Sequence, residues 1–424
     1  MRIKSLKVHQ ETLENGLKVV LVHKPNFVKS LFMCTTFVGG FDTKQISNHE
    51  VICHPSGCAH FLEHQMFRLD GKDVSEEFAM YQAQTNAFTS YKETAYYFQT
   101  TSDVKKSIDL LLRFVENLDI DVSSVEKEKG IILSEYDMTF QNPEQQLVTE
   151  TLKSLYSNHP LINDILGSRK DIQNMTVADL QRFYFLNYDP SRLCLIGVTG
   201  KNPNEIMNWI KESQKDVPSK ICEVYHCYYP EEPQQVARSY FEKKMDISVP
   251  YVCVAYKMQG IKDALQAMKL DQSIEMALEA NFSSMNPEYQ TWIDNRIITA
   301  SCGAECDFTT DHGYILFYAQ TEKVDAFIEL VEKQVKLLKN QVISSSIFKA
   351  LKAKYKASSI RSMDQFETVA MDIIRALQEG YEYEEGLMIY DDITVESVHE
   401  CVKQLDFGHR AIVKIIPKGS KLSN

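Results

Sequence analysis

The apolar segments of this chain follow one order twice, and this repetition limits the folds that the chain can adopt. Residues 30–38 and 192–198 have the apolar content of strands, and residues 251–256 and 411–416 take the corresponding places in the second half. Helical patterns lie between the strands of each pair. An order of strand, helix, strand, helices and strand predicts an α+β unit of roughly 200 residues that occurs twice. We expect two similar domains, each with an antiparallel or mixed sheet packed against helices.

A polar stretch separates the two halves. It contains Pro230, Glu231, Glu232 and Pro233, which are residues typical of a connection rather than of a helix or strand. We therefore predict an N-terminal domain at residues 1–215, a linker at 216–238 and a C-terminal domain at 239–424.

Composition excludes some classes of protein. The chain has 424 residues, with 46 Lys+Arg against 58 Asp+Glu and a formal net charge of −12, which argues against a general nucleic-acid binder. No apolar stretch reaches the roughly 18 residues that a membrane span needs, and we recognise no signal peptide. The ten cysteines are scattered and do not form a disulfide framework, so reduced thiols in the cytoplasm are expected.

The segment His60-Phe61-Leu62-Glu63-His64 carries the strongest chemical signal. Two histidines four residues apart share one face of a helix and can bind one zinc ion. Glu63 lies within one turn of His60, so its carboxylate can reach a water on that ion and act as a general base. His-x-x-Glu-His is the signature of one class of zinc peptidases. A pattern this short also occurs by chance, and paired histidines on a helix can be surface residues.

Two histidines leave a catalytic zinc one protein ligand short. Glu126, Glu128 and Glu135 lie on a predicted helix at 123–140 and supply candidates. The alternative is that these glutamates form a solvated helix face. Cys53, His54 and Cys58 could also bind a metal, but their spacing fits no common structural zinc site.

Further motifs resemble the pitrilysin, insulinase and mitochondrial processing peptidase superfamily, and among its members the small two-domain bacterial proteins of the YmfH-like branch. The resemblance extends over essentially the whole chain. The matching segments are Thr12–Leu17, Gly57–Phe67, Asn86–Thr89, Val125–Glu128, Tyr188–Leu193 and Val413–Lys418.

The resemblance implies a zinc endopeptidase with one Zn²⁺ per chain. It assigns His60 and His64 as ligands, Glu63 as general base and Glu126 as the third ligand. It leaves Glu128 as a surface residue and gives Glu135 a supporting role next to the ligands.

The resemblance also predicts how the substrate binds. Asn86, Ala87, Phe88 and Thr89 match the strand beside which the family binds a peptide, by addition to the edge of a sheet. The alternative is that these residues serve only the strand and the core.

One departure concerns a substrate-contacting Arg and Tyr, seven residues apart, in the second half of many relatives. Here Ile293 takes the Arg position and Thr299 or Ala300 the Tyr position, while Arg296 is out of register. Either this branch binds its substrate differently, or a homologous subunit, in a homodimer or a heterodimer, completes the site. We therefore expect a peptidase that hydrolyses short or unfolded peptides. One candidate substrate is a ribosomally made peptide that needs maturation. The alternative is a non-catalytic or regulatory peptide-binding subunit.

Overall fold

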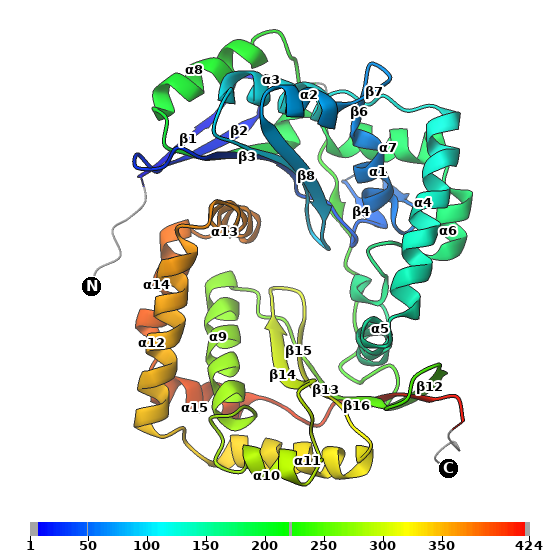
Figure 1. The fold of residues 1–424 in the computed structure, drawn as a ribbon, viewed down its shortest axis with the longest axis vertical. Coiled ribbons are helices and arrows are strands. Elements are labelled where there is room, and N and C mark those ends of the chain that lie inside the picture. The colour runs from blue at the N-terminus through cyan, green and yellow to red at the C-terminus, as the bar shows by residue number, and fades with distance from the viewer. Residues whose placement is uncertain (1–6, 49, 220–222, 420–424) are drawn as a thin grey trace. The chain divides into compact units, whose positions relative to one another are not determined.

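The computed structural model describes residues 7–48, 50–219 and 223–419. The chain folds into two compact units (Figure 1). Unit 1 comprises Met1–Asp137, Asn163–Tyr229 and Ser362–Gln378, and unit 2 comprises Met138–Ile162, Pro230–Arg361 and Glu379–Asn424. The boundaries at 215/216 and 238/239 stay a prediction about the sequence domains. In space, each unit also contains a segment from the other half of the chain.

Unit 1 is built on a six-stranded sheet of order β1-β2-β10-β3-β9-β8. Its strands are β1 (Lys7–Thr12), β2 (Lys18–His23), β3 (Ser30–Thr36), β8 (Ala83–Thr89), β9 (Thr94–Thr100) and β10 (Leu193–Thr199). β2 and β10 are parallel, whereas the other neighbouring pairs are antiparallel. The short strands of unit 1 are β4 (Lys44–Ile46), β5 (Val51–Cys53), β6 (Arg68–Leu69), β7 (Lys72–Asp73) and β11 (His226–Cys227).

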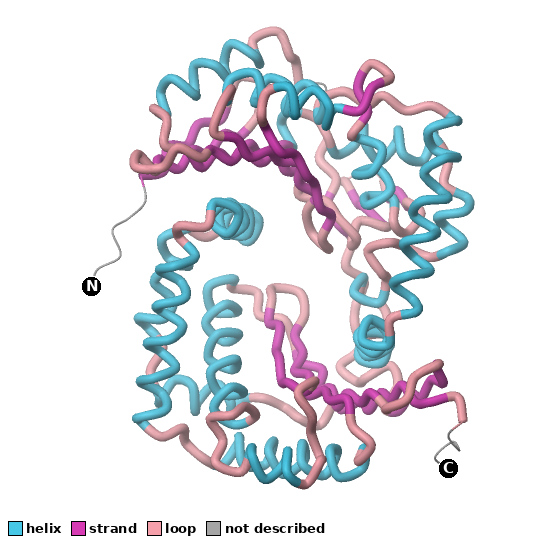
Figure 2. Tube along the Cα trace, in the orientation of Figure 1, coloured by secondary structure: helices cyan, strands magenta, loops and turns pink. Residues whose placement is uncertain are grey.

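Helices cover one face of this sheet, which Figure 2 shows in magenta beside the cyan helices. Phe32 and Cys34 of β3 point to this face and belong to the main core of unit 1. α3 and α8 pack on the sheet there. The helices of the first half in this unit are α1 (Cys58–Met66), α2 (Val74–Met80), α3 (Val104–Val115), α4 (Val122–Gln141), α6 (Arg169–Asn174), α7 (Val177–Asn187) and α8 (Pro203–Gln214), with a 3-10 turn at Pro190–Arg192.

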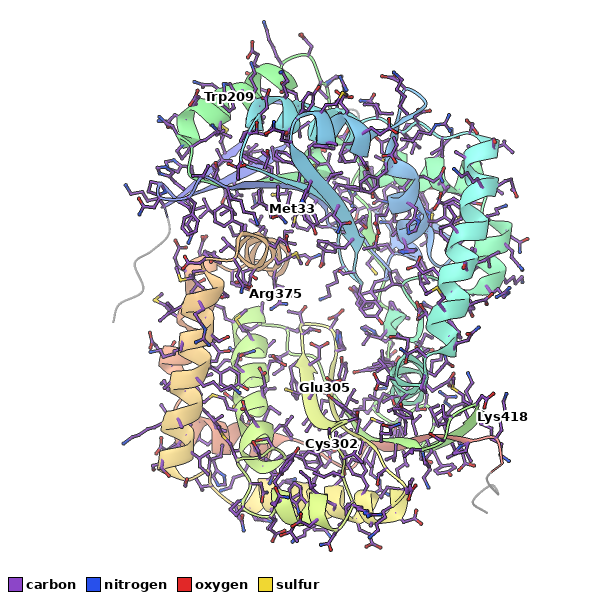
Figure 3. All side chains as sticks on the ribbon, in the orientation of Figure 1. Met33, Trp209, Cys302, Glu305, Arg375 and Lys418 are labelled. Atoms are coloured by element: carbon purple, nitrogen blue, oxygen red, sulfur yellow. The ribbon has the colours of Figure 1, made fainter. Side chains whose placement is uncertain are left out.

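The opposite face of the sheet is covered by α13 (Phe366–Glu379), a helix from the second half of the chain. Leu31 and Met33 of β3 point to this face and are fully buried, and Figure 3 labels Met33 there. The Phe366 ring of α13 lies 5.3 Å from the Phe27 ring. Both faces of the sheet are therefore apolar and covered.

Unit 2 is built on a five-stranded sheet of order β12-β16-β13-β15-β14. Its strands are β12 (Tyr240–Met245), β13 (Tyr251–Met258), β14 (Cys302–Phe308), β15 (Gly313–Gln320) and β16 (Arg410–Pro417). β12 is parallel to β16, and the remaining neighbours are antiparallel. This is the pairing pattern of β2-β10-β3-β9-β8 in unit 1. The prediction of two similar α+β domains is thus confirmed.

The helices of unit 2 also lie on both faces of its sheet. α5, from the first half of the chain, packs on β13 and β16, whereas α9 packs on β14. The helices are α5 (Pro143–Leu155), α9 (Ala264–Asn281), α10 (Tyr289–Asp294), α11 (Val324–Asn340), α12 (Ser345–Ser362), α14 (Tyr383–Asp392) and α15 (Val395–Gln404), with a 3-10 turn at Pro160–Ile162. The two halves of the chain thus exchange one helix each, α5 for α13.

Among the described residues, no helix has the length and apolarity that crossing a lipid bilayer requires.

Candidate metal centre

α1 presents the histidine motif because its opposite side is anchored in the core. Phe61 and Leu62 are fully buried and belong to the main apolar cluster of unit 1. Gly57 begins the helix with φ +80°, and a Cβ there would lie 2.2 Å from the Leu166 carbonyl oxygen. Only glycine fits this turn, because the left-handed conformation and the close backbone both disfavour a side chain. The start and the orientation of the helix are therefore fixed.

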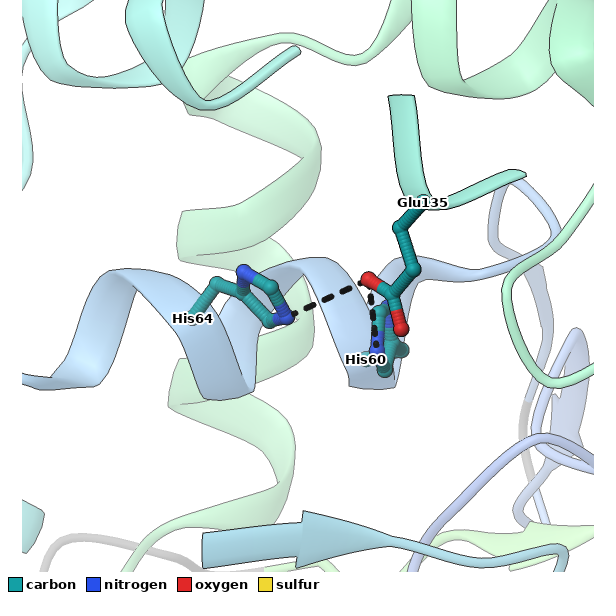
Figure 4. Close-up of side chains that lie close together, drawn as sticks. All are labelled: His60, His64 and Glu135. Carbon is teal, nitrogen blue, oxygen red and sulfur yellow. Dashed lines mark ion pairs between the residues drawn. The ribbon is translucent and has the colours of Figure 1, made fainter. Parts of the chain in front are cut away.

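His60, His64 and Glu135 come together in unit 1 (Figure 4). Glu135 Oε2 lies 3.8 Å from His60 Nε2 and 3.7 Å from His64 Nε2. In a tetrahedral zinc site with bonds of about 2.0–2.2 Å, neighbouring donor atoms are about 3.3 Å apart. Two imidazole nitrogens and a carboxylate at nearly this spacing form a donor set that fits a zinc ion.

Glu126, which the resemblance assigned as third ligand, does not join this cluster. Its carboxylate points to solvent, with 61% of the side chain exposed, and accepts a 2.6 Å hydrogen bond from Lys129 Nζ. The structure instead brings Glu135, nine residues later on the same helix, to the two histidines. We therefore replace Glu126 by Glu135 as the candidate third ligand.

Glu128 holds His64 in place, although the sequence interpretation made it a surface residue. One carboxylate oxygen lies 2.9 Å from His64 Nδ1, and only 16% of the Glu128 side chain is exposed. This contact directs His64 Nε2 toward Glu135, as carboxylates beside metal-binding histidines commonly do. A signal for both glutamates was present, because Glu128 and Glu135 flank the buried Ile132 on α4.

His60 is suited to donate a lone pair of its imidazole ring to a metal ion. Burial, with the nearby His64, lowers its pKa to about 4, so the imidazole is neutral at pH 7. Its Nδ1 atom is buried and has no hydrogen-bond partner among the described residues.

Glu63 lies on the same face of α1 and is bound from the neighbouring strand. Thr89 Oγ1 donates a 2.9 Å hydrogen bond to Glu63 Oε2. Burial raises the pKa of Glu63 above its usual range. A half-buried carboxylate that is held by a hydrogen bond beside a metal site is placed to exchange a proton with a water molecule there.

The predicted substrate strand is the outermost strand of the unit 1 sheet. Among the residues that the structure describes, β8 pairs only with β9, and it packs beside α1. Asn86 is exposed, and the Phe88 and Tyr97 rings are 6.5 Å apart. The strand thus has one edge that is not paired within the sheet, as peptide addition requires.

The positions of the missing Arg–Tyr pair lie in unit 2. Ile293 is on α10 with 36% of its surface exposed. Thr299 Oγ1 donates a 2.9 Å hydrogen bond to the Gln320 carbonyl. Neither side chain is the Arg or Tyr that the resemblance predicts at these positions.

Unit 2 holds a second group of possible metal ligands, His159, Asp311 and His312. His159 Nδ1 accepts a hydrogen bond from the Leu161 amide, so its proton is on Nε2, the nitrogen that faces Asp311 at 3.6 Å. His312 has a carboxylate at each ring nitrogen, Asp311 at 3.1 Å and Asp307 at 3.0 Å, which raises its pKa to about 8. This group is a buried network of hydrogen bonds and charges.

Family models and relatives of known sequence cover both halves of the chain. Residues 54–169 match the model of the insulinase family (peptidase family M16), and residues 174–355 match that of the peptidase M16 inactive domain. The uncharacterized zinc protease YmfH of Bacillus subtilis is 27% identical over 417 residues, which are 97% of each chain. The mitochondrial-processing peptidase subunit beta of Neurospora crassa is 23% identical over 88% of this chain and 79% of its own.

Solved structures agree in fold. An M16-like peptidase structure from Alicyclobacillus acidocaldarius superposes with a TM-score of 0.91 at 26% identity, over 98% of this chain and 100% of that one. A protease from Helicobacter pylori superposes with a TM-score of 0.82 at 20% identity, over 97% and 100%. The chain belongs to the insulinase (M16) family of peptidases, with two domains of similar fold.

Proposed function

We propose that this protein is a zinc-dependent endopeptidase that hydrolyses short or unfolded peptides. The observation that carries the proposal is the cluster of His60, His64 and Glu135, with Glu63 beside it and an unpaired sheet edge next to it. In this proposal the three clustered residues bind one zinc ion per chain.

The residues divide the reaction between them. Bound by these residues, a zinc ion would lower the pKa of a water molecule to about 7 and polarise the scissile carbonyl. Glu63 accepts the proton of the attacking water and delivers it to the leaving amine. Glu128 keeps His64 oriented through the 2.9 Å contact to Nδ1.

The substrate binds as an added strand along residues 86–89 of β8. Alternate residues of this strand direct their backbone N–H and C=O groups to the edge, so affinity comes chiefly from the peptide backbone. Only an extended, unfolded segment can pair in this way, which favours short or unfolded peptides as substrates. A ribosomally made peptide with a flexible leader is one such substrate.

Substitution of Glu63 tests the reaction. Glu63→Gln keeps the size of the side chain but removes the proton acceptor, so cleavage of an unstructured peptide should fall at least a hundredfold. Zinc content, measured by atomic emission, should remain about one per chain. Glu126→Gln serves as the control, since Glu126 lies outside the cluster and should leave the rate unchanged.

The alternative is a non-catalytic peptide-binding subunit. Wild-type protein that contains zinc, binds an unstructured peptide and cleaves none, alone or with a homologous partner, would establish that alternative.

We further propose that the protein pairs with a homologous subunit, as a homodimer or heterodimer, in the cytoplasm. The Arg–Tyr positions hold Ile293 and Thr299 or Ala300, and one relative is named as a subunit of a processing peptidase. No disulfide joins the cysteines that the structure describes, which is compatible with a reducing compartment. Sedimentation of the protein purified from its host should give twice the mass of one chain; an active monomer would contradict the pairing.

A further inference from the structure

The Thr89 hydroxyl is directed inward, at α1. Thr89 is the last residue of β8, and its Oγ1 donates to Glu63 Oε2 at 2.9 Å. Side chains alternate along a strand, so Thr89, Ala87 and Thr85 share the face of β8 that is opposite to Asn86 and Phe88. The inward face of the strand therefore ends in a hydroxyl bound to the proposed general base.

The backbone that carries Thr89 is fixed on several sides. Thr89 pairs with Thr94 in β9, so the turn 90–93 follows it directly. The amides of Gly40 and Phe41 donate to the Ser90 and Tyr91 carbonyls at 2.8 and 2.9 Å. From α13, the Gln378 side chain donates to the Lys92 carbonyl at 2.7 Å. Thr89 is consequently a rigid point to which another side chain can be attached.

Glu63, in contrast, has a long side chain with several rotatable bonds. Its carboxylate must lie within hydrogen-bond reach of the attacking water, because proton transfer depends on this distance. A single hydrogen bond from a rigid donor removes most of the freedom that would carry the carboxylate away. Thr89 supplies such a donor, and it stands on the strand to which the peptide is proposed to add.

We propose that Thr89 is a positioning residue that holds the Glu63 carboxylate through its side-chain hydroxyl, and so ties the general base to the substrate-binding strand. This inference rests on the proposed peptidase function for its effect on rate. It also revises the role of Thr89 from a substrate contact to an orienting contact.

Thr89→Val is the test, because valine keeps the β-branched shape that suits a strand and lacks the donor. Loss of a hydrogen bond to a charged group should lower kcat about tenfold to a hundredfold. KM should change less than about twofold. Thr89→Ser keeps a hydroxyl and should restore most of kcat.

Thr85→Val is the matched control on the same face of the same strand. The Thr85 hydroxyl donates to the Tyr97 carbonyl at 3.0 Å and not to α1, so its loss should leave kcat near the wild-type value. An equal loss of kcat in both valine variants would overturn the inference, as would a change confined to KM in Thr89→Val.

A second readout does not depend on activity. Crystal structures of the zinc-loaded variants should show the Glu63 carboxylate displaced in Thr89→Val and in place in Thr89→Ser and Thr85→Val. An undisplaced Glu63 in Thr89→Val overturns the inference even if activity falls. A displaced Glu63 supports it even if the wild-type protein cleaves no peptide, in which case only the proposed function fails. Loss of folding in Thr89→Val and Thr89→Ala but not in Thr85→Val would make Thr89 a structural residue and also overturn it.

Discussion

At the scale of single residues, the angular position of a glutamate on α4 decides whether it can bind the ion. Successive residues of a helix are about 100° apart, so Glu126 and Glu135, nine residues apart, point in nearly opposite directions. Glu128 and Glu135, seven residues apart, differ by only about 20°. Ile132 lies between them and is fully buried, which turns this side of α4 inward. The resemblance pointed to helix α4, but the direction of each side chain around that helix decides which glutamate is the candidate ligand.

Zinc binding should therefore distinguish the two glutamates. Glu135→Gln removes an anionic donor from the cluster and should weaken zinc binding at least a hundredfold, whereas Glu126→Gln should leave it unchanged. Competition with a chromogenic chelator measures both affinities. The opposite order would restore Glu126 as the ligand.

Asp271 in unit 2 makes a residue-level prediction about pH. Its Oδ1 accepts from the Phe308 amide at 3.1 Å, and burial together with the nearby Asp307 and Glu275 raises its pKa from 3.8 to about 7. The folded protein thus keeps a proton on Asp271 that the unfolded chain loses near pH 4. The free energy of unfolding should fall as pH rises between these values, by at most about 1.4 kcal/mol for each pH unit.

Asp271→Asn stays neutral and should become more stable relative to the wild type as pH rises from 4 to 7. Urea titrations at several pH values measure this difference. Asp294→Asn, at an exposed position of α10, controls for the loss of one negative charge. Equal behaviour of the two variants would show that Asp271 ionises freely in the folded state.

At the scale of elements, local sequence was sufficient for most of the site. The helix expected at 123–140 is α4, the helix expected to carry His60 and His64 is α1, and the strand expected at residues 86–89 lies within β8. Periodicity and turn residues determine such elements locally. The contact of Thr89 with Glu63 was not predictable in this way, because it depends on how β8 packs against α1.

The turn that begins α1 gives a prediction at this scale. Gly57→Ala places a Cβ against the Leu166 carbonyl at φ +80° and should cost about 2 kcal/mol or more of unfolding free energy. Gly130→Ala is the control, since a Cβ at this position of α4 has no atom within 4 Å. It should stabilise the protein by about 0.5–1 kcal/mol. Thermal unfolding measures the stability of both variants. A Gly57→Ala variant as stable as the wild type would show that alanine is not strained at this turn.

At the scale of the whole molecule, the exchange of helices between the halves is the feature that sequence could not supply. The apolar face of α13 predicts that the helix is buried but not on which sheet, because both sheets present apolar faces. α13 buries six apolar side chains, namely Phe366, Val369, Ala370, Ile373, Ile374 and Ala376. α5 does the same for unit 2, where the Tyr156 hydroxyl after its last turn donates to the Gly313 carbonyl at 2.7 Å. Each half of the chain therefore completes the other.

The exchange predicts that cutting the chain at its linker will not yield two independent domains. A fragment of residues 1–229 lacks α13 and exposes the sheet face that contains Leu31 and Met33. Burial of a large apolar side chain contributes about 1.5–3 kcal/mol, so the loss of this layer is comparable to the whole stability of a typical domain. The fragment alone should be aggregated or unfolded.

Joining residues 362–379 to that fragment through a long Gly/Ser linker should restore a cooperative thermal transition. A scrambled helix of the same composition, with Ile373 and Ile374 moved to its polar side, controls for the added length. It should not restore the transition. Circular dichroism and size-exclusion chromatography compare the three proteins. A fragment 1–229 that melts at the same temperature with and without α13 would mean that the helix is dispensable for unit 1. The reciprocal fragment, 230–424, should require α5 for the same reason, because α5 covers β13 and β16.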